Sequence, residues 1–165
     1  MPAPFLFTAF YDSPIGRIEI QGSEAGISRL DFVDPEAARP RPGRMSPRPA
    51  PLAECLEQLD EYFRGGRTAF TVKLDLRGTD FQKAVWAKLL RVKFDQSTTY
   101  KALAAAVGRP AATRAVGGAN HRNPVSIIVP CHRVVGSDGR LTGYGGGLWR
   151  KDWLLRHEGH DRLLV

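Results

Sequence analysis

The residues best suited to covalent chemistry stand together in the segment IIVPCHRVVG, residues 127–136. Cys131 follows an apolar run and a proline, and His132 and Arg133 come directly after it. A cysteine attacks as its thiolate, and a free thiol with a pKa of about 8.5 is mostly protonated at neutral pH. A neighbouring histidine could act as the base, and an arginine could supply a positive field. The segment is therefore compatible with a nucleophilic cysteine, but a cysteine after an apolar strand is by default a core residue, and local context alone favours the core residue.

Activation of Cys131 by His132 needs a local bend or a bridging water, because adjacent residues at the end of a strand point to opposite faces. The histidine also needs an acceptor that orients it, and the best candidate is Glu158 in the segment LLRHEGH. That segment resembles a zinc motif only superficially, because His157 and His160 are three positions apart where the HExxH pattern requires four. The sequence therefore favours a nucleophile, a base and a carboxylate without a metal ion.

The elements that must position these residues divide the chain into two lobes. Residues 1–77 begin with three short β-rich segments separated by turns with Gly or Pro. A Pro- and Arg-rich stretch near 34–50 predicts a flexible loop, and an apolar helical pattern begins at Leu52. Cys55 lies on the apolar face of that helix and is expected to be a core residue. Residues 78–165 are predicted to be mostly helical, so the expected fold class is α+β.

The second lobe contains the pattern of a helix-turn-helix. After a helix capped by Thr79 or Asp80, the stretch 99–107 predicts a short helix, GRP a turn, and 111–120 a second helix. The segment AATRAVGGA in the second helix offers Arg114 as its one long polar side chain, and almost nothing that could read base edges in a major groove. A helix with so little bulk suits close approach to a backbone or a narrow groove, with Arg114 as a projecting finger.

The formal net charge of +7 is unevenly distributed: residues 1–75 carry −2 and residues 76–165 carry +9. A basic second lobe indicates a polyanionic partner, although a solvated basic face would have the same composition. No apolar run approaches the roughly 20 residues of a membrane span, and the N-terminus lacks a signal-peptide pattern. We therefore expect a cytoplasmic protein, or a nuclear one if its source has a nucleus, with its two cysteines as free thiols.

Five motifs follow one another in the second lobe: AVGGA, NPV, PCHRVVG, GYGGG and LLRHEGH. In this order they closely resemble the O6-alkylguanine-DNA alkyltransferase family. The resemblance runs from FQKAVWAKLL through HEGH, and extends more loosely to DSPIG and TVKLDLRGTDFQ. It implies a winged helix-turn-helix-like motif and a DNA repair protein that flips O6-alkylguanine, and also O4-alkylthymine, out of the duplex. The alkyl group would then pass irreversibly to Cys131, once per molecule and without a cofactor.

Position by position, the resemblance implies a catalytic set. Cys131 is similar to the acceptor cysteine, and His132 to the histidine that deprotonates it through a water. Glu158 is similar to the carboxylate that holds this histidine, and Asn123 to the asparagine that holds the active-site turn. Tyr100 is similar to the tyrosine that contacts the guanine edge and the adjacent DNA phosphate.

The resemblance also implies residues that contact DNA or line the substrate pocket. Arg114 is similar to the finger that fills the gap left by the extruded nucleotide. Further DNA contacts are expected from these residues: Tyr100, Ala115, Gly117, Gly118, Ala119 and Arg133. The pocket is expected to involve Val134, Tyr144 and Gly145, the last at a position where some members carry serine.

The expected partner is double-stranded DNA containing alkylated bases, bound by a monomer, with cooperation between copies on DNA left open. No metal, membrane or cofactor is expected. Two other classes stay open: a non-catalytic binder of alkyl lesions or helix-turn-helix regulator, and a Cys-His hydrolase. The presence of Cys131, His132 and Glu158 argues against the first class. The second would require repeated turnover, and the sequence offers no obvious oxyanion hole for it.

Overall fold

The computed structural model describes residues 6–36 and 48–160. It divides into two compact units, Met1–Leu76 and Arg77–Val165. Each unit has its own buried apolar residues. The Pro- and Arg-rich stretch predicted to be a flexible loop falls mostly outside the described residues. No helix within the described ranges is long and apolar enough to cross a bilayer.

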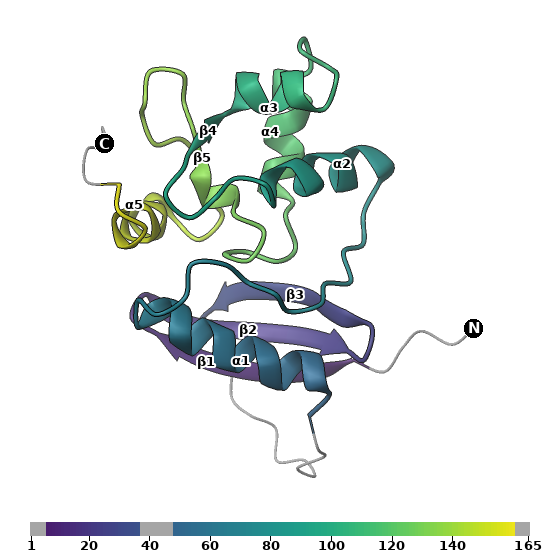
Figure 1. The fold of residues 1–165 in the computed structure, drawn as a ribbon, viewed down its shortest axis with the longest axis vertical. Helices are drawn as coiled ribbons and strands as arrows, with labels where there is room; N and C mark the ends of the chain where they lie inside the picture. Colours follow the sequence, from purple (N-terminus) through teal and green to yellow (C-terminus); the bar gives the residue numbers. More distant parts are fainter. Residues whose placement is uncertain (1–5, 37–47, 161–165) are drawn as a thin grey trace. The chain divides into compact units, whose positions relative to one another are not determined.

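The first unit is a three-stranded antiparallel sheet with one helix packed against it (Figure 1). The strands lie in the sheet in chain order: β1 (Phe7–Ser13), β2 (Gly16–Ser23) and β3 (Gly26–Val33). The helix is α1 (Ala50–Phe63). Gly16 and Gly26 have φ angles of 122° and 134°, which only glycine adopts easily, and so allow the two tight turns between strands. The three β-rich segments expected from the sequence are therefore confirmed as strands, and they pair as an antiparallel meander.

The core of the first unit forms between the sheet and α1. Alternate residues of the strands and the apolar stripe of α1 are fully buried, including Ile18, Ile20, Leu30, Leu52 and Leu59. Cys55 belongs to this core with no exposed area. Burial, with a smaller contribution from Glu54, raises the pKa of its thiol to about 12, so Cys55 stays protonated and unreactive.

The second unit is mainly helical and contains a two-stranded parallel ladder. Its elements in chain order are α2 (Asp80–Leu89), β4 (Thr98–Thr99), α3 (Tyr100–Ala106), α4 (Thr113–His121), the 3-10 turn η1 (Cys131–Arg133), β5 (Val134–Val135) and α5 (Leu148–His157). β4 pairs with β5, and a loop of residues 136–147 leads from β5 to α5. With the sheet of the first unit, these elements confirm the predicted α+β class.

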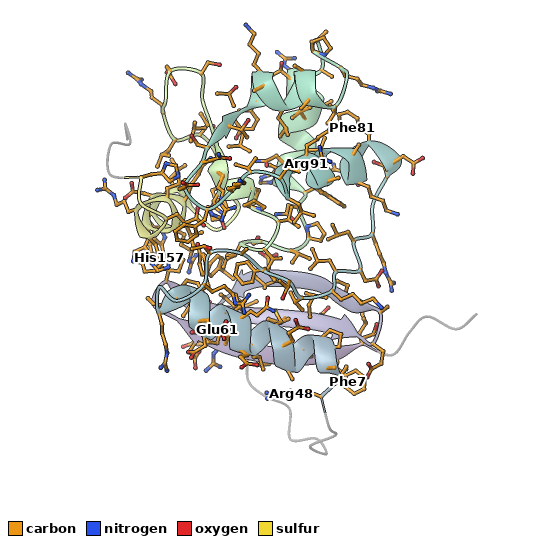
Figure 2. All side chains as sticks on the ribbon, viewed as in Figure 1. Phe7, Arg48, Glu61, Phe81, Arg91 and His157 are labelled. Atoms are coloured by element: carbon orange, nitrogen blue, oxygen red, sulfur yellow. The ribbon has the colours of Figure 1, made fainter. Side chains whose placement is uncertain are left out.

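Local signals explain where α2 begins and what it contacts. Thr79 caps it: the Gln82 amide N–H donates to the Thr79 hydroxyl, and the Gln82 side chain accepts from the Thr79 N–H. The Trp86 indole donates to the carbonyl of Ala119 in α4 over 2.9 Å. Phe81, labelled in Figure 2, lies 5.4 Å from the guanidinium carbon of Arg109 in the turn between α3 and α4. These contacts connect α2 to the helix-turn-helix.

The helix-turn-helix consists of α3 and α4. Gly108, with a φ of 76°, follows the end of α3, as the sequence predicted. The second helix begins at Thr113, two residues later than predicted. The reason is a turn, in which the Ala112 N–H donates to the Arg109 carbonyl over 2.9 Å.

Candidate active site and DNA-binding face

The apolar run before Cys131 is a turn and not the strand that its composition indicated. Ile127 has a φ of 71°, a left-handed conformation that is costly for a β-branched residue. Its side chain is nevertheless buried, with 1% exposed. Cys131 and His132 then continue into the 3-10 turn η1, so the alternation of faces along a strand does not apply to them.

Asn123 holds this turn through both ends of its side-chain amide. Its Nδ2 donates to the Val129 carbonyl over 2.7 Å, and its Oδ1 accepts from the Val125 N–H over 3.0 Å. These bonds bracket the strained Ile127 and fix the backbone two residues before Cys131. The side chain therefore has the geometry of a support for the active-site turn.

Replacing Asn123 with alanine should lower the free energy of unfolding by about 1 to 3 kcal/mol, because the buried Val125 N–H loses its acceptor and the strain at Ile127 is no longer opposed. The Val129 carbonyl still accepts from the Cys131 N–H over 2.8 Å. Urea denaturation followed by tryptophan fluorescence measures the loss. Ser126→Ala is the matched control, since no side-chain hydrogen bond of Ser126 supports the turn. Equal stability of the two variants would contradict the role given to Asn123.

His132, Arg133 and Glu158 form one buried hydrogen-bonded cluster. The His132 Nε2 lies 2.8 Å from Glu158 Oε1, and both residues are at most 1% exposed. Arg133 donates its Nε and one terminal nitrogen to the same carboxylate over 2.8 and 2.9 Å. Its other terminal nitrogen donates to the Val92 carbonyl over 2.6 Å. A single carboxylate from the end of α5 therefore orients the histidine and neutralises the arginine.

The electrostatics of the cluster keep Glu158 ionised. Burial alone would raise the pKa of Glu158, but the charges and hydrogen bonds of His132 and Arg133 outweigh it and lower the pKa to about 2. Burial lowers the pKa of His132 and outweighs the opposing effect of Glu158. The imidazole is therefore neutral at neutral pH beside a permanent carboxylate.

The free nitrogen of His132 is the main chemical feature of the site. Because Nε2 donates to Glu158, Nδ1 carries the lone pair of the neutral ring. Nδ1 is buried and has no hydrogen-bond partner among residues 6–36 and 48–160. Because the thiol of Cys131 is not hydrogen-bonded to this oriented, unprotonated nitrogen, its proton would reach the nitrogen through a bridging water.

Arg133 and Ala119, both expected to contact DNA, are buried in the structure. Arg133 is 6% exposed, and its nitrogens are used by Glu158 and Val92. Withdrawing it toward DNA would leave the buried carboxylate without its guanidinium, which is costly. Ala119 is 3% exposed and faces α2, where its carbonyl accepts from Trp86. The contacts of Arg133 and Ala119 with DNA therefore stay predictions.

The opposite face of α4 is open. Arg114, Ala115 and Gly118 are exposed, and Gly117 is partly exposed. A Cβ added at Gly118 would meet no atom within 4 Å, so the surface around this glycine is open. Arg122, which sequence reasoning missed, is exposed at the end of the helix. Its spacing of four residues from Gly118 and eight from Arg114 is the signal that places it on the same stripe.

Tyr100 connects the helix-turn-helix to the loop after β5. Its phenol oxygen accepts a hydrogen bond from the Thr142 hydroxyl over 3.1 Å. Its ring lies beside Gly117 of α4, because a Cβ added at Gly117 would lie 3.8 Å from the Cδ1 atom of Tyr100. Of the expected pocket residues, the loop carries two, the partly buried Tyr144 and the exposed Gly145, and β5 carries the buried Val134. Their contact with a substrate stays a prediction.

Lys151 is a buried cation that sequence reasoning missed. It has no exposed area, and its ammonium donates to the Thr142 carbonyl over 2.7 Å. Burial lowers the pKa of Lys151 to about 8, and the negative charge of the Cys131 thiolate opposes this shift. Lys151 precedes Glu158 by seven residues, about two helical turns, so both lie on the same side of α5. This spacing of seven residues, with the apolar Leu154 between them, is the signal by which the sequence could have placed Lys151 on the buried side of α5.

Comparison with known proteins identifies the family. The profile described as "6-O-methylguanine DNA methyltransferase, ribonuclease-like domain" matches residues 6–76, and the corresponding "DNA binding domain" matches residues 80–160. A "Methylated-DNA--protein-cysteine methyltransferase" from Methanosarcina barkeri is 45% identical over 152 residues, covering 90% of this chain and 96% of the relative. The chain belongs to the 6-O-methylguanine DNA methyltransferase family. The resemblance of its motifs to this alkyltransferase family is thereby confirmed.

Further members of the methyltransferase family agree with this assignment. A relative of the same name from Mycobacterium leprae is 47% identical and covers 92% of both chains. The crystal structure of the Mycobacterium tuberculosis O6-methylguanine methyltransferase superposes with a TM-score of 0.80 at 41% identity, covering 98% of this chain and 96% of that one. The Mycobacterium tuberculosis OGT in complex with DNA gives a TM-score of 0.79 at 44% identity over 90% of both chains. Within the part of this methyltransferase that the structure describes, no group of three or more His, Cys, Asp or Glu is placed to hold a metal ion.

Proposed function

We propose that this protein is a methylated-DNA-protein-cysteine methyltransferase that transfers the alkyl group of O6-alkylguanine in double-stranded DNA to its own Cys131. The observation that carries the proposal concerns His132, which is neutral and is held by Glu158. The Nδ1 atom of His132 has no hydrogen-bond partner among the described residues, and His132 lies in the same turn as the Cys131 thiol. The family of the chain supports the reaction. The relative solved in complex with DNA supports duplex DNA as the partner.

The reaction balances without a cofactor. The thiol proton of Cys131 passes through a water to His132 Nδ1, and the thiolate attacks the alkyl carbon. A sulfur–carbon bond forms while the carbon–O6 bond breaks, and its electron pair remains on the purine. The purine then gains one proton, which replaces the one lost by the thiol, and the Tyr100 phenol assists by donating a hydrogen bond. Water does not cleave the thioether product, so each molecule acts once.

Access to Cys131 requires the damaged base to leave the helix. The cysteine is only 6% exposed, and the alkyl carbon of a paired base lies inside the stack. We propose that the open face of α4 binds the minor groove and that Arg114 occupies the gap left by the extruded nucleotide. O4-alkylthymine presents the same kind of exocyclic ether and is proposed as a second substrate.

Arg114→Ala should slow transfer from duplex DNA strongly and transfer from the free base hardly at all. Extruding a base costs a few kcal/mol, and loss of Arg114 removes the group that keeps the gap open. A free O6-alkylguanine base has no stack to leave. The measurement is the pair of rate constants, one with duplex DNA and one with the free base, together with the salt dependence of DNA binding, whose slope should fall by about one unit.

The control for this experiment is Arg91→Ala. Arg91 is an exposed arginine after α2, labelled in Figure 2, and lies outside the helix-turn-helix. Its removal should leave the ratio of the two rates unchanged. Equal losses on duplex and free base in Arg114→Ala would show that Arg114 supports the fold or the thiol instead of the flipped base.

A stoichiometry experiment tests the proposed function against its alternatives. Duplex DNA carrying O6-methylguanine with a radiolabelled methyl group is incubated in excess with the protein, and label in protein and in solution is counted over time. We expect label to move to the protein and to stop at one equivalent. Release of labelled methanol over many turnovers would support a hydrolase, and retention of all label on bound DNA would support a non-catalytic binder.

A further inference from the structure

The loop after β5 returns to the helix-turn-helix at Thr142. Because β4 pairs with β5, Tyr100 directly after β4 and Gly136 directly after β5 begin at neighbouring positions (Figure 1). A closed turn then reverses the chain, in which the Gly136 N–H donates to the Arg140 carbonyl over 2.9 Å. The loop therefore comes back beside the point at which it started.

The side chain and the backbone of Thr142 are both held in place. Its methyl group lies beside Gly136, because a Cβ added at Gly136 would lie 3.7 Å from the methyl carbon. Its hydroxyl donates to the Tyr100 phenol oxygen over 3.1 Å. Its carbonyl accepts from the ammonium of Lys151, a residue with no exposed area, over 2.7 Å. The hydroxyl of Thr142 is therefore fixed in its direction toward Tyr100.

The Tyr100 side chain is placed by two elements. Its ring lies against Gly117 of α4, and its phenol oxygen meets Thr142 of the loop. Within the described part of the chain, Thr142 is the one hydrogen-bond partner of the phenol. A phenol can accept a hydrogen bond and donate its own proton at the same time. Since Thr142 uses the phenol oxygen as an acceptor, the phenol proton is left for another acceptor.

We propose that Thr142 is a positioning residue for alkyl transfer, whose hydroxyl directs the phenol proton of Tyr100 toward the leaving purine. This inference rests on the proposed function, in which Tyr100 donates a hydrogen bond to the purine as the carbon–O6 bond breaks. A hydrogen bond that the phenol oxygen receives also polarises the phenol and strengthens the one that it donates. Thr142 keeps its own proton and contacts no reacting atom.

The test is the rate of transfer by Thr142→Val, which keeps the branched shape and the backbone carbonyl but removes the hydroxyl. With protein in saturating excess over duplex DNA containing O6-methylguanine, the rate should fall by about 2- to 10-fold, the range for loss of one hydrogen bond. The Kd for DNA, measured by fluorescence anisotropy, should stay at its wild-type value. Thr142→Ser keeps the hydroxyl and should restore most of the rate. An unchanged rate in Thr142→Val would overturn the proposal.

A double-mutant cycle with Tyr100→Phe tests whether Thr142 acts through the phenol. Phenylalanine keeps the ring beside Gly117 and removes the phenol oxygen. In the Tyr100→Phe protein, Thr142→Val should cause no further loss of rate, because the group that Thr142 orients is absent. Losses that add in free energy would show that Thr142 acts by another route, and the proposal would be wrong.

Alkylation of Cys131 by iodoacetamide separates this role from a disruption of the loop. Iodide leaves without a proton, so neither the Tyr100 phenol nor Thr142 assists that reaction. Thr142→Val should therefore react with iodoacetamide at the wild-type rate, and equal slowing with iodoacetamide and with DNA would contradict the proposal. Thr68→Val is the matched control, the same change at an exposed position of the first unit, and should leave both rates unchanged.

These outcomes are separable from a failure of the proposed function. Wild-type protein that takes no alkyl group from DNA would refute the reaction and, with it, the role of Thr142. Wild-type transfer that Thr142→Val leaves unaffected would refute the role of Thr142 alone.

Discussion

Cys131→Ser should abolish alkyl transfer while leaving binding to duplex DNA nearly unchanged. A serine hydroxyl does not ionise near neutral pH and has no comparable nucleophilicity, even with His132 beside it. The side chain is 6% exposed and lies outside the open face of α4, so the substitution removes chemistry and not the DNA-binding surface. Transfer is measured as loss of O6-methylguanine from a duplex oligonucleotide, and binding by fluorescence anisotropy of the same oligonucleotide.

Cys55→Ala is the matched control for this prediction. Cys55 is fully buried in the core of the first unit, and its thiol has a pKa raised to about 12. The folded Cys55→Ala protein should therefore transfer the methyl group at the wild-type rate. Transfer by Cys131→Ser, or its loss in folded Cys55→Ala, would assign the reaction to a different nucleophile.

Glu158→Gln should slow transfer by about 10² to 10⁴, the usual contribution of an oriented base. Glutamine retains the size and one acceptor oxygen, but it cannot stabilise an imidazolium at His132 and leaves the buried Arg133 without its counter-charge. Removing one partner of a buried ion pair also costs about 3 to 5 kcal/mol of stability. The rate with free O6-alkylguanine base and the free energy of unfolding are therefore both measured, at a temperature where the variant is folded.

Asp152→Asn provides the comparison for Glu158→Gln. Asp152 is also an acid of α5, but it pairs with Arg156 at the surface, where such pairs contribute little. The substitution Asp152→Asn should leave both the transfer rate and the free energy of unfolding close to their wild-type values. A wild-type rate in folded Glu158→Gln would remove Glu158 from the mechanism.

The depressed pKa of Glu158 also predicts a pH dependence of stability. Its folded-state pKa of about 2 lies below the value of about 4.3 for an unperturbed glutamate. The stability that it contributes is therefore fully present above about pH 4.3 and is lost as the pH falls toward 2. Any change in transfer rate between about pH 5 and 8 then reports on groups other than Glu158.

Most helices and strands could be predicted from the sequence because they are determined by residues close to one another in the chain. Alternating apolar residues and glycine turns define β1 to β3, and Thr79 with Gln82 forms the cap of α2. The segment before Cys131 was predicted incorrectly because β-branched residues favour strands. Here the side chain of Asn123 holds Ile127 in a conformation that its own preference opposes.

The sequence predicted those site residues whose role follows from their chemical type. It predicted less well the residues whose role follows from being buried beside a partner distant in the chain. Cys131, His132 and Glu158 could be proposed from their chemistry and motifs, and the last two are hydrogen-bonded. For Arg133 the family resemblance implied only a DNA contact. Its partner in the structure, Glu158, lies 25 residues away in the sequence, and only the packing of η1 on α5 brings the two together. Lys151 was missed for the same reason.

Mass spectrometry of the protein after incubation with excess duplex DNA containing O6-methylguanine shows directly whether Cys131 takes an alkyl group from DNA. We expect every active molecule to gain the mass of one methylene and no more. Peptide mapping should place this mass on Cys131 with Cys55 unmodified, and the lesion should become guanine. A protein of unchanged mass, whether the lesion persists or disappears, would contradict this expectation.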